Sequence, residues 1–341
     1  MKISNKLNVQ VIAEVGVNHN GNLTLAKKLI VQAKKCGADF VKFQIYNPSE
    51  ITTKYAKKAV YQKKNDKKSD SQYKMLKKYN FSLDQFKILK NFCKKTKINF
   101  LASAFDISSL RNLNKLKPNF FKIPSGEINN IPYLEHISQY KKNVFLSTGM
   151  SNLKEINQAI NTLIRFGLKK NQITLMQCIS NYPTKISDLN LNVLSTFKKE
   201  FNLNLGFSDH TTSIEAPLFA IFKGARVIEK HITLNKNMEG PDHKASLNIP
   251  EFKKMIENII NLKSSLGKFS KTPNKEEKKI ALLVRKSIVA KKKIKKGDLF
   301  TKNNLTCKRP GYGMNPSKLK YLLNKKSNKN YSVDEMVRID L

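Results

Sequence analysis

The amino-acid sequence predicts an α/β fold, a (β/α)₈ TIM barrel followed by a small C-terminal β-rich domain. Short β-rich runs recur along the first three-quarters of the chain, and each is followed by a polar stretch with helical spacing. Several runs are apolar on both faces, as buried parallel strands are. Because the count of strand–helix units and a length of about 265 residues match a barrel, we favour it over an open, doubly wound sheet.

The predicted strands, in chain order, are Val9–Val17, Asp39–Tyr46, Asn99–Phe105, Phe120–Ser125, Asn143–Gly149, Ile173–Ser180, Asn204–His210 and Ala225–Thr233. Between them, Leu23–Cys36 and Asn152–Phe166 have the spacing of amphipathic helices. Ser82–Gln85 and Thr212–Glu215 match the capping-box pattern and predict helix starts. The segment from about Thr53 to Asn80 is too long for an ordinary connection. We expect an excursion there that could cover the barrel mouth.

The character of the sequence changes after Gly267. Residues 268–284 are mainly polar and include Pro273, so we interpret them as a linker between a barrel domain, 1–267, and a small domain, 285–341. The small domain has short alternating stretches at Arg285–Ala290 and Leu305–Arg309, with a turn between them at Lys296–Asp298. So short a domain needs good packing or a partner to be stable.

Composition excludes several classes of protein. Hydrophobic residues make up 40% of the chain, enough for a buried core, so wholesale disorder is excluded. No window approaches the ~18 continuous apolar residues of a membrane-spanning helix, and no export signal is visible. The four cysteines are scattered without a Cys-x-x-Cys pair, which argues against a disulfide framework or a zinc cluster. We therefore expect a cytoplasmic protein without a membrane partner.

The charge is strongly basic, with a formal net charge of +39. A basic nucleic-acid-binding protein is therefore one alternative. However, only six of the 64 Lys and Arg residues are arginines, and the lysines are spread over nearly every segment. Nucleic-acid readers cluster arginine for bidentate contacts. We interpret the lysines as a compositional bias on solvated faces, with steering of an anionic substrate as the functional alternative.

Polar residues gather at the predicted C-terminal ends of the strands, where barrels of this kind place their active sites. Lys42 and Lys122 stand out because each lies inside an otherwise apolar strand, where a lysine is costly to bury unless it meets an anion. Each could instead snorkel out between helices. The neighbouring strand ends carry hydroxyls, and together with the lysines these predict a cradle for a phosphate and a carboxylate: Ser103, Ser125, Ser147 and Ser208.

His210 and His231 end consecutive predicted strands, so we expect them to face each other across the rim. Such a pair suits a catalytic divalent metal whose other positions are open to water and substrate. The alternative is two ordinary rim histidines. His19 could be a turn residue or a substrate contact.

Carboxylates also gather at the predicted barrel mouth. Glu14 and Glu127 could bind hydroxyls or act as a base. Asp209 and Asp242 are further mouth carboxylates. For Glu229 the simplest expectation is that it neutralises the adjacent Lys230.

Several strings in this order resemble the sialic acid synthase family, the N-acetylneuraminate, legionaminate and pseudaminate synthases. They are EVGVNHNG at 14–21, VKFQ at 41–44, FKIPSGE at 121–127, LSTGM at 146–150, GFSDHT at 206–211, VIEKHIT at 227–233 and GPDHKASL at 240–247. The last part of the chain resembles the family's antifreeze-like (SAF) domain, with RKS at 285–287 and KRPG at 308–311. The resemblance covers essentially the whole chain.

The resemblance implies a domain-swapped homodimer that condenses phosphoenolpyruvate with an N-acetylated amino sugar, without nucleic acid. It implies phosphoenolpyruvate contacts from Lys42, Ser103, Lys122, Ser125, Ser147, Ser180 and Ser208. It implies Mn²⁺ or Mg²⁺ at His210 and His231. It implies sugar contacts from Glu14, Gln44, Glu127, Tyr182, Asp242 and, from the partner's small domain, Arg309. Our catalytic candidates are Glu127, placed by position for proton transfer, with Lys42, Lys122 and Glu14.

The sequence departs from the family pattern at strand six, where Ser180 stands in place of Asn and Gln177 in place of His. The main interpretation of the sequence as a whole is an N-acetylneuraminate synthase that uses N-acetylmannosamine. The alternative is a legionaminate synthase that uses 2,4-diacetamido-2,4,6-trideoxymannose. A barrel enzyme joining phosphoenolpyruvate to a phosphorylated aldose would need a second anion site, for which only Arg309 is available.

Overall fold

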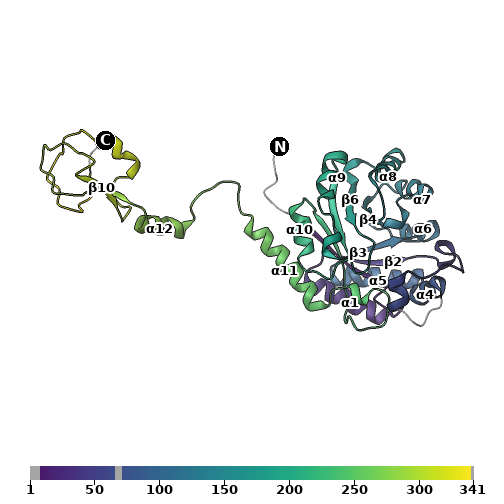
Figure 1. Cartoon of the computed structure of the whole chain (residues 1–341). Coiled ribbons are helices and arrows are strands. Elements are labelled where there is room, and N and C mark those ends of the chain that lie inside the picture. Colours follow the sequence, from purple (N-terminus) through teal and green to yellow (C-terminus); the bar gives the residue numbers. More distant parts are fainter. Residues whose placement is uncertain (1–7, 66–70, 339–341) are drawn as a thin grey trace. The chain divides into compact units, whose positions relative to one another are not determined.

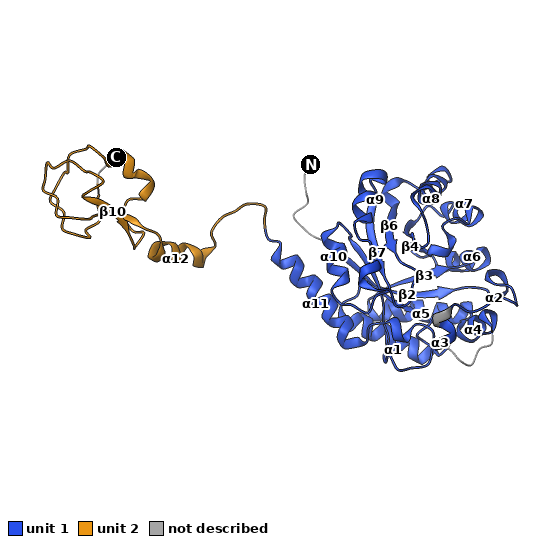
Figure 2. Ribbon diagram, viewed as in Figure 1, with its two compact units in different colours: residues 1–267 blue, residues 268–341 orange. Residues whose placement is uncertain are grey.

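The computed structural model describes residues 8–65 and 71–338 (Figure 1). Residues 1–7, 66–70 and 339–341 lie outside the described residues, and they include the start of the chain and part of the expected excursion. Contacts divide the chain into two compact units, residues 1–267 and 268–341 (Figure 2).

The first unit is a closed barrel of eight parallel strands in sequence order, so the predicted fold class is confirmed. The strands are β1 (Gln10–Gly16), β2 (Phe40–Ile45), β3 (Asn99–Ala104), β4 (Phe120–Ile123), β5 (Asn143–Ser147), β6 (Ile173–Cys178), β7 (Asn204–Asp209) and β8 (Val227–His231). The barrel closes through a parallel pairing of β1 with β8, in which Glu14 lies opposite His231. Each strand falls within a predicted run.

Helices surround the barrel (Figure 1). They are α1 (Leu23–Cys36), α5 (Leu83–Thr96), α6 (Ile107–Lys115), α7 (Ile131–Ser138), α8 (Leu153–Arg165), α9 (Val193–Phe201), α10 (Ala216–Phe222) and α11 (Ile249–Ser265). The predicted capping box of Ser82 and Gln85 opens α5. The one predicted at Thr212 is wrong, because α10 begins at Ala216 and its first amide donates to the Ser213 hydroxyl instead.

The expected excursion after β2 contains three short helices, α2 (Pro48–Ile51), α3 (Val60–Asn65) and α4 (Gln72–Tyr79). Val17, Met75 and Tyr79 form a small apolar cluster that joins α4 to the loop after β1. The approach is so close that a Cβ on Gly21 would lie 2.7 Å from the Lys78 carbonyl oxygen, and Gly21 also has a φ of +70°. Only glycine fits both requirements.

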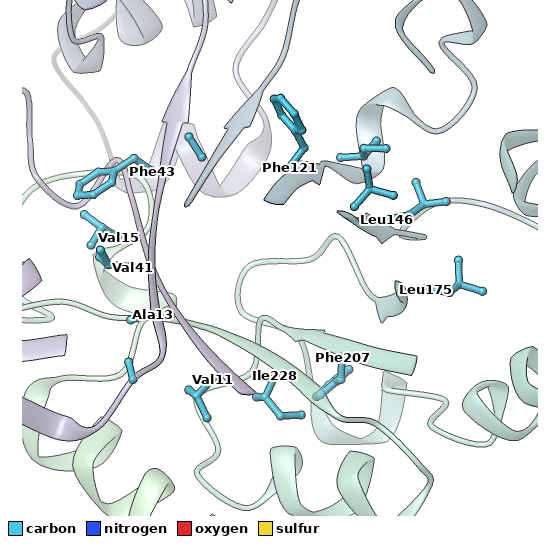
Figure 3. Close-up of a cluster of buried hydrophobic side chains, with 14 of the residues drawn as sticks. Val11, Ala13, Val15, Val41, Phe43, Phe121, Leu146, Leu175, Phe207 and Ile228 are labelled. Carbon is cyan, nitrogen blue, oxygen red and sulfur yellow. The ribbon is translucent and has the colours of Figure 1, made fainter. Parts of the chain in front are cut away.

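The alternation of side chains along the strands separates two apolar layers. Outward-facing residues such as Val41, Phe121 and Phe207 pack against the helices (Figure 3). Inward-facing residues form a separate buried cluster inside the barrel, made of Ile12, Phe40, Leu101, Phe145, Met176 and Val227, with Phe120 packed against it. This cluster closes one level of the barrel, so the next inward position on each strand faces the C-terminal opening.

The second unit contains α12 (Lys275–Val284), β9 (Ser287–Ala290), β10 (Leu305–Lys308) and α13 (Leu319–Leu322). The strands β9 and β10 pair antiparallel, in the two regions where alternation was expected. The stretch expected to be a linker, 268–284, contains α12. A core that includes Ile288, Phe300 and Tyr331 holds the unit together.

The four cysteines are all free, as expected. Within 8–65 and 71–338, no helix has the length and apolar character required to cross a bilayer.

The layer between strands and helices sets the stability of the barrel. We expect Ile228→Ala to lower the free energy of unfolding by about 2–5 kcal/mol, because Ile228 is fully buried there and truncation leaves a cavity. Ile186→Ala is the matched control, since Ile186 is 55% exposed, and it should change stability by no more than about 0.5 kcal/mol. Urea unfolding followed by circular dichroism measures both. Equal effects would contradict the assigned layer.

Candidate active site

A pocket of about 480 Å³ lies at the C-terminal ends of the barrel strands. It brings together the barrel residues to which the resemblance assigned a role: Glu14, Lys42, Gln44, Ser103, Lys122, Ser125, Glu127, Ser147, Ser180, Tyr182, Ser208, His210, His231 and Asp242. Arg309 belongs to the second unit, where it follows β10.

The strand pleat explains why these residues meet. Two positions after each residue of the buried cluster inside the barrel, the same strand carries a residue that lines the pocket. On β1, for example, Ile12 is followed by Glu14, and on β2, Phe40 is followed by Lys42. The inward positions so defined are Glu14, Lys42, Ser103, Lys122, Ser147, Cys178 and Glu229. On β7, Ser208 lines the pocket two positions after Gly206.

Two buried ammonium groups share one carboxylate at the bottom of the pocket. The Oε1 atom of Glu229 lies 3.4 Å from Nζ of Lys42 and 3.4 Å from Nζ of Lys122. Ser208 donates a hydrogen bond to the same oxygen at 3.1 Å. Lys42 also pairs with Glu14 at 3.0 Å and donates to the Ser103 hydroxyl at 3.1 Å. Neither lysine snorkels out between helices.

The expectation that Glu229 neutralises Lys230 is wrong. Adjacent strand residues face opposite sides, so Glu229 points into the barrel and Lys230 points outward. Lys230 pairs instead with Asp209, at 2.5 Å, on the outer side of the barrel. Asp209 is therefore not a mouth carboxylate either.

Burial and pairing shift the pKa values of this cluster in different directions. Burial opposes ionisation of Glu229, but Lys122 and Lys42 outweigh it and lower its pKa to about 2. For Lys42, the nearby Glu14 and Glu229 outweigh burial and raise the pKa. For Lys122, burial dominates and lowers the pKa. Lys122 is thus the ammonium with less counter-charge, which an anionic ligand would supply.

Hydroxyl and amide groups lie beside the two ammonium groups at the bottom of the pocket. Ser147 Oγ is buried and has no hydrogen-bond partner, so it is free to bind a ligand. The amide of Gly149 donates to Ser125 Oγ at 2.9 Å. A Cβ on Gly149 would lie 2.8 Å from Ser125 Oγ and would collide with Ser180 Oγ. The glycine therefore lets the backbone approach both serines closely.

The two imidazoles lie together as predicted, with ring centroids 5.5 Å apart. Nδ1 of His210 lies 2.6 Å from the Ile179 carbonyl oxygen, to which it must donate. In the neutral ring this makes Nε2 the acceptor, and the Tyr182 hydroxyl lies 3.0 Å from it, so a metal ion at Nε2 would replace that hydrogen bond.

His231 offers a second nitrogen to a metal ion. Its Nδ1 is buried, has no hydrogen-bond partner and lies 3.9 Å from Asp242 Oδ2. Burial and the neighbouring His210 lower the pKa of His231 well below its usual value, so the ring is neutral, as a metal ligand must be. Among the described residues, no group of three or more His, Cys, Asp or Glu side chains is arranged to hold a metal. The donors fit a divalent ion whose remaining positions go to water and substrate.

Two carboxyl groups with raised pKa values, Glu127 and Asp242, line the upper pocket. Burial raises the pKa of Glu127, although Asn130 donates to it at 2.6 Å. Burial and the nearby Glu14 raise the pKa of Asp242 to about 7. Gln44 donates to Glu14 Oε1 at 3.1 Å.

A hydrogen-bond chain holds the loop that carries Asp242. The Ser246 hydroxyl donates to the Asp242 carbonyl at 2.7 Å and accepts from Asn18 at 2.8 Å. His243 lies 2.7 Å from Thr233 and 3.2 Å from Asn20 on the loop after β1. The loop is thereby tied to two strand ends.

His19 acts in the turn after β1 and does not line the pocket. Its ring stacks on Phe81 at 4.1 Å, and its Nδ1 accepts from the Gly21 amide at 3.0 Å. Gln177 also lies outside the pocket, because it faces outward on β6 and donates to the Leu189 carbonyl at 3.1 Å.

Sequence reasoning missed two groups of pocket residues. Cys178 lines the floor, and strand alternation from Met176 could have revealed it. The outer wall comes from the excursion, as expected of a segment that covers the barrel mouth, but the sequence did not identify the side chains that line it: Ile51, Thr52, Ala59, Gln62, Gln72, Met75, Leu76 and Tyr79.

A pocket that places two buried ammonium groups beside hydroxyl groups at the strand ends of a barrel is suited to an enzyme that acts on an anion. Comparison with known proteins places it more closely. The model of the NeuB family matches residues 29–271, and that of the SAF domain matches residues 285–340. The chain belongs to the NeuB family, as the resemblance implied. It is a phosphoenolpyruvate-using enzyme that forms carbon–carbon bonds with an amino sugar.

Three relatives cover most of the chain. The N,N'-diacetyllegionaminic acid synthase of Campylobacter jejuni is 47% identical over 96% of this chain and 98% of that protein. The synthase of the same name from Legionella pneumophila is 40% identical over 94% and 91%. The crystal structure of N-acetylneuraminic acid synthetase from Leptospira borgpetersenii matches with a TM-score of 0.69 and 30% identity, covering 80% of this chain and 90% of that one.

The pocket floor should bind a simple anion. Inorganic phosphate at 100 times its Kd should stabilise the wild-type protein by about 2.7 kcal/mol, and a tenfold weaker affinity in Lys122→Met should reduce this to about 1.4 kcal/mol or less. Lys87→Met is the control, because Lys87 is exposed and lies outside the pocket. Chemical unfolding at constant ionic strength measures the effect. Equal stabilisation of all three proteins would contradict the proposed cradle.

Proposed function

We propose that the protein condenses phosphoenolpyruvate with 2,4-diacetamido-2,4,6-trideoxymannose to give N,N'-diacetyllegionaminic acid and phosphate. The near full-length identity of 47% to a synthase of that name carries the proposal. A second synthase of the same name supports it. The sequence favoured N-acetylmannosamine as the acceptor, but these relatives support the alternative. Because the chain belongs to an enzyme family, nucleic-acid binding is not proposed.

The outer wall of the pocket supports the choice of sugar. It combines the apolar side chains of Ile51, Met75 and Leu76 with the amides of Gln62 and Gln72. The trideoxy sugar carries a methyl group at C6 and a second acetamido group at C4. Such a wall accommodates methyl groups and can hydrogen-bond an amide, whereas hydroxyl groups facing the apolar part would lose their water partners.

The floor of the pocket would hold the donor. Lys42, Lys122 and the serine hydroxyls would bind its phosphate and carboxylate through charge-assisted hydrogen bonds, replacing Glu229 as the partner of the ammonium groups. Because these groups are already in place and shielded from water, they would stabilise the charge that shifts during reaction without reorganising.

The acceptor aldehyde would lie beside the imidazoles. A Mn²⁺ or Mg²⁺ ion bound by His210 and His231 would polarise its carbonyl as a Lewis acid. C3 of phosphoenolpyruvate attacks the aldehyde carbon, water adds to C2, and phosphate leaves by C–O cleavage. Glu127, whose pKa is raised, would move protons at the upper pocket, and Glu14 would hold the sugar hydroxyls.

Arg309 would complete the sugar site from the partner subunit of a domain-swapped homodimer. Its planar guanidinium can bind an acetamido carbonyl and an adjacent oxygen together. The SAF match, residues 285–340, includes this residue.

Phosphate release in the presence of each sugar tests the substrate. We expect kcat/KM for the diacetamido-trideoxy sugar to exceed that for N-acetylmannosamine by at least about tenfold, because unpaired hydroxyl groups penalise the latter. Met75→Gln, which places an amide on the apolar wall, should narrow this preference. A preference for N-acetylmannosamine would restore the N-acetylneuraminate interpretation.

Mixed dimers test the position of Arg309. Arg309→Ala and Lys122→Met subunits should each be inactive alone, whereas an equal mixture should regain about a quarter of wild-type activity, because half the dimers then contain one complete site. Separately mixed proteins that have not exchanged subunits are the control. If Arg309 serves its own barrel, no activity returns after exchange.

A further inference from the structure

Lys230 is a fully buried charge outside the pocket that the proposed mechanism does not use. Its Nζ lies 2.5 Å from Asp209 Oδ2, 2.6 Å from the Thr211 carbonyl oxygen and 3.0 Å from Thr211 Oγ1. An ammonium group has three hydrogens, so these three acceptors satisfy it completely. Asp209 in turn accepts from the Thr211 amide at 2.8 Å and from the Thr211 hydroxyl at 3.2 Å.

The place of this cluster in the chain points to its role. Asp209 and Thr211 are the two residues that flank His210, and Lys230 immediately precedes His231. Asp209 and Lys230 are also direct partners in the parallel pairing of β7 with β8. One ammonium group therefore fixes the backbone on both sides of one imidazole and next to the other. The strand pleat sends the cluster outward and both imidazoles into the pocket.

Stability alone does not account for a buried ion pair. Taking two charges out of water offsets most of their attraction, and well-packed apolar replacements are often neutral or stabilising. A buried, fully hydrogen-bonded pair does, however, fix one geometry. The pair lies next to two imidazoles whose ring centroids are 5.5 Å apart, so the geometry that it fixes includes the backbone that carries both rings.

We propose that Lys230 is a positioning residue which, through Asp209 and Thr211, holds His210 and His231 in the relative arrangement that a divalent cation requires. The inference rests on the proposed role of the two imidazoles in metal binding. Groups that orient metal ligands in this way typically contribute 10- to 100-fold to metal affinity.

The test is Mn²⁺ affinity of the full-length protein, measured by electron paramagnetic resonance without substrates. The double variant Asp209→Leu/Lys230→Met should unfold at the same urea concentration as wild type, or higher, yet bind Mn²⁺ roughly 10- to 100-fold more weakly. Lys236→Met is the control, because Lys236 pairs with Glu251 close to the cluster but contacts neither flanking residue. It should leave affinity unchanged. Unchanged affinity in a folded double variant would overturn the proposal.

A milder pair of variants covers the case in which the double variant does not fold. Thr211→Val removes the hydroxyl contacts and keeps the carbonyl, so Mn²⁺ affinity should fall several-fold. Thr211→Ser retains the hydroxyl and should stay within about twofold of wild type. Equal affinities in the two variants would count against the positioning role.

A metal-independent readout separates this proposal from the proposed function. In protein labelled at the histidine Cε1 positions, the double variant should shift the resonances of His210 and His231 and leave that of His136 unchanged. If wild-type protein binds no Mn²⁺, the metal role fails, and the resonances still decide whether Lys230 positions the rings. Resonances that do not move would refute the positioning role.

Discussion

The site depends on the burial of two ammonium groups inside an apolar barrel. Lys42 and Lys122 are 4% and 3% exposed, and a buried charge is tolerated only when it is paired. Glu229 supplies one oxygen to both, and Glu14 supplies a second partner to Lys42 alone. The carboxylates are thus the counter-ions of the two lysines. A small dianion would meet positive charge and hydroxyl groups that are already positioned.

The strand pleat divides this charge between two compartments. On β8, Glu229 and His231 face the pocket, while Lys230 between them faces outward and is neutralised by Asp209. A shift of register by one residue would exchange the two sets and leave both compartments with unpaired charge. Electrostatic pairing and apolar packing therefore specify the same register.

Loops form the outer part of the pocket, beyond the residues at the strand ends. The strand ends supply charge, hydroxyls and imidazoles, all close to the barrel axis. The excursion between β2 and β3 and the loop that carries Asp242 supply the outer wall. Asn65 on the excursion donates to the Pro241 carbonyl at 3.0 Å, which joins the two. A family that uses one donor with different sugars can vary this wall without disturbing the floor.

The sequence by itself determined the barrel, the approximate position of each strand and the set of residues at the strand ends, because strand-like apolar runs are local properties. It identified Lys42, Lys122 and the two histidines by their chemistry within apolar strands. Only the tertiary structure decided which side chains contact one another. Glu229 pairs with two lysines from distant strands and not with its neighbour, His19 lies in a turn outside the pocket, and particular side chains of the excursion line the mouth. Such pairings depend on which side of a strand each residue faces and on contacts between segments far apart in the chain, which no local pattern encodes.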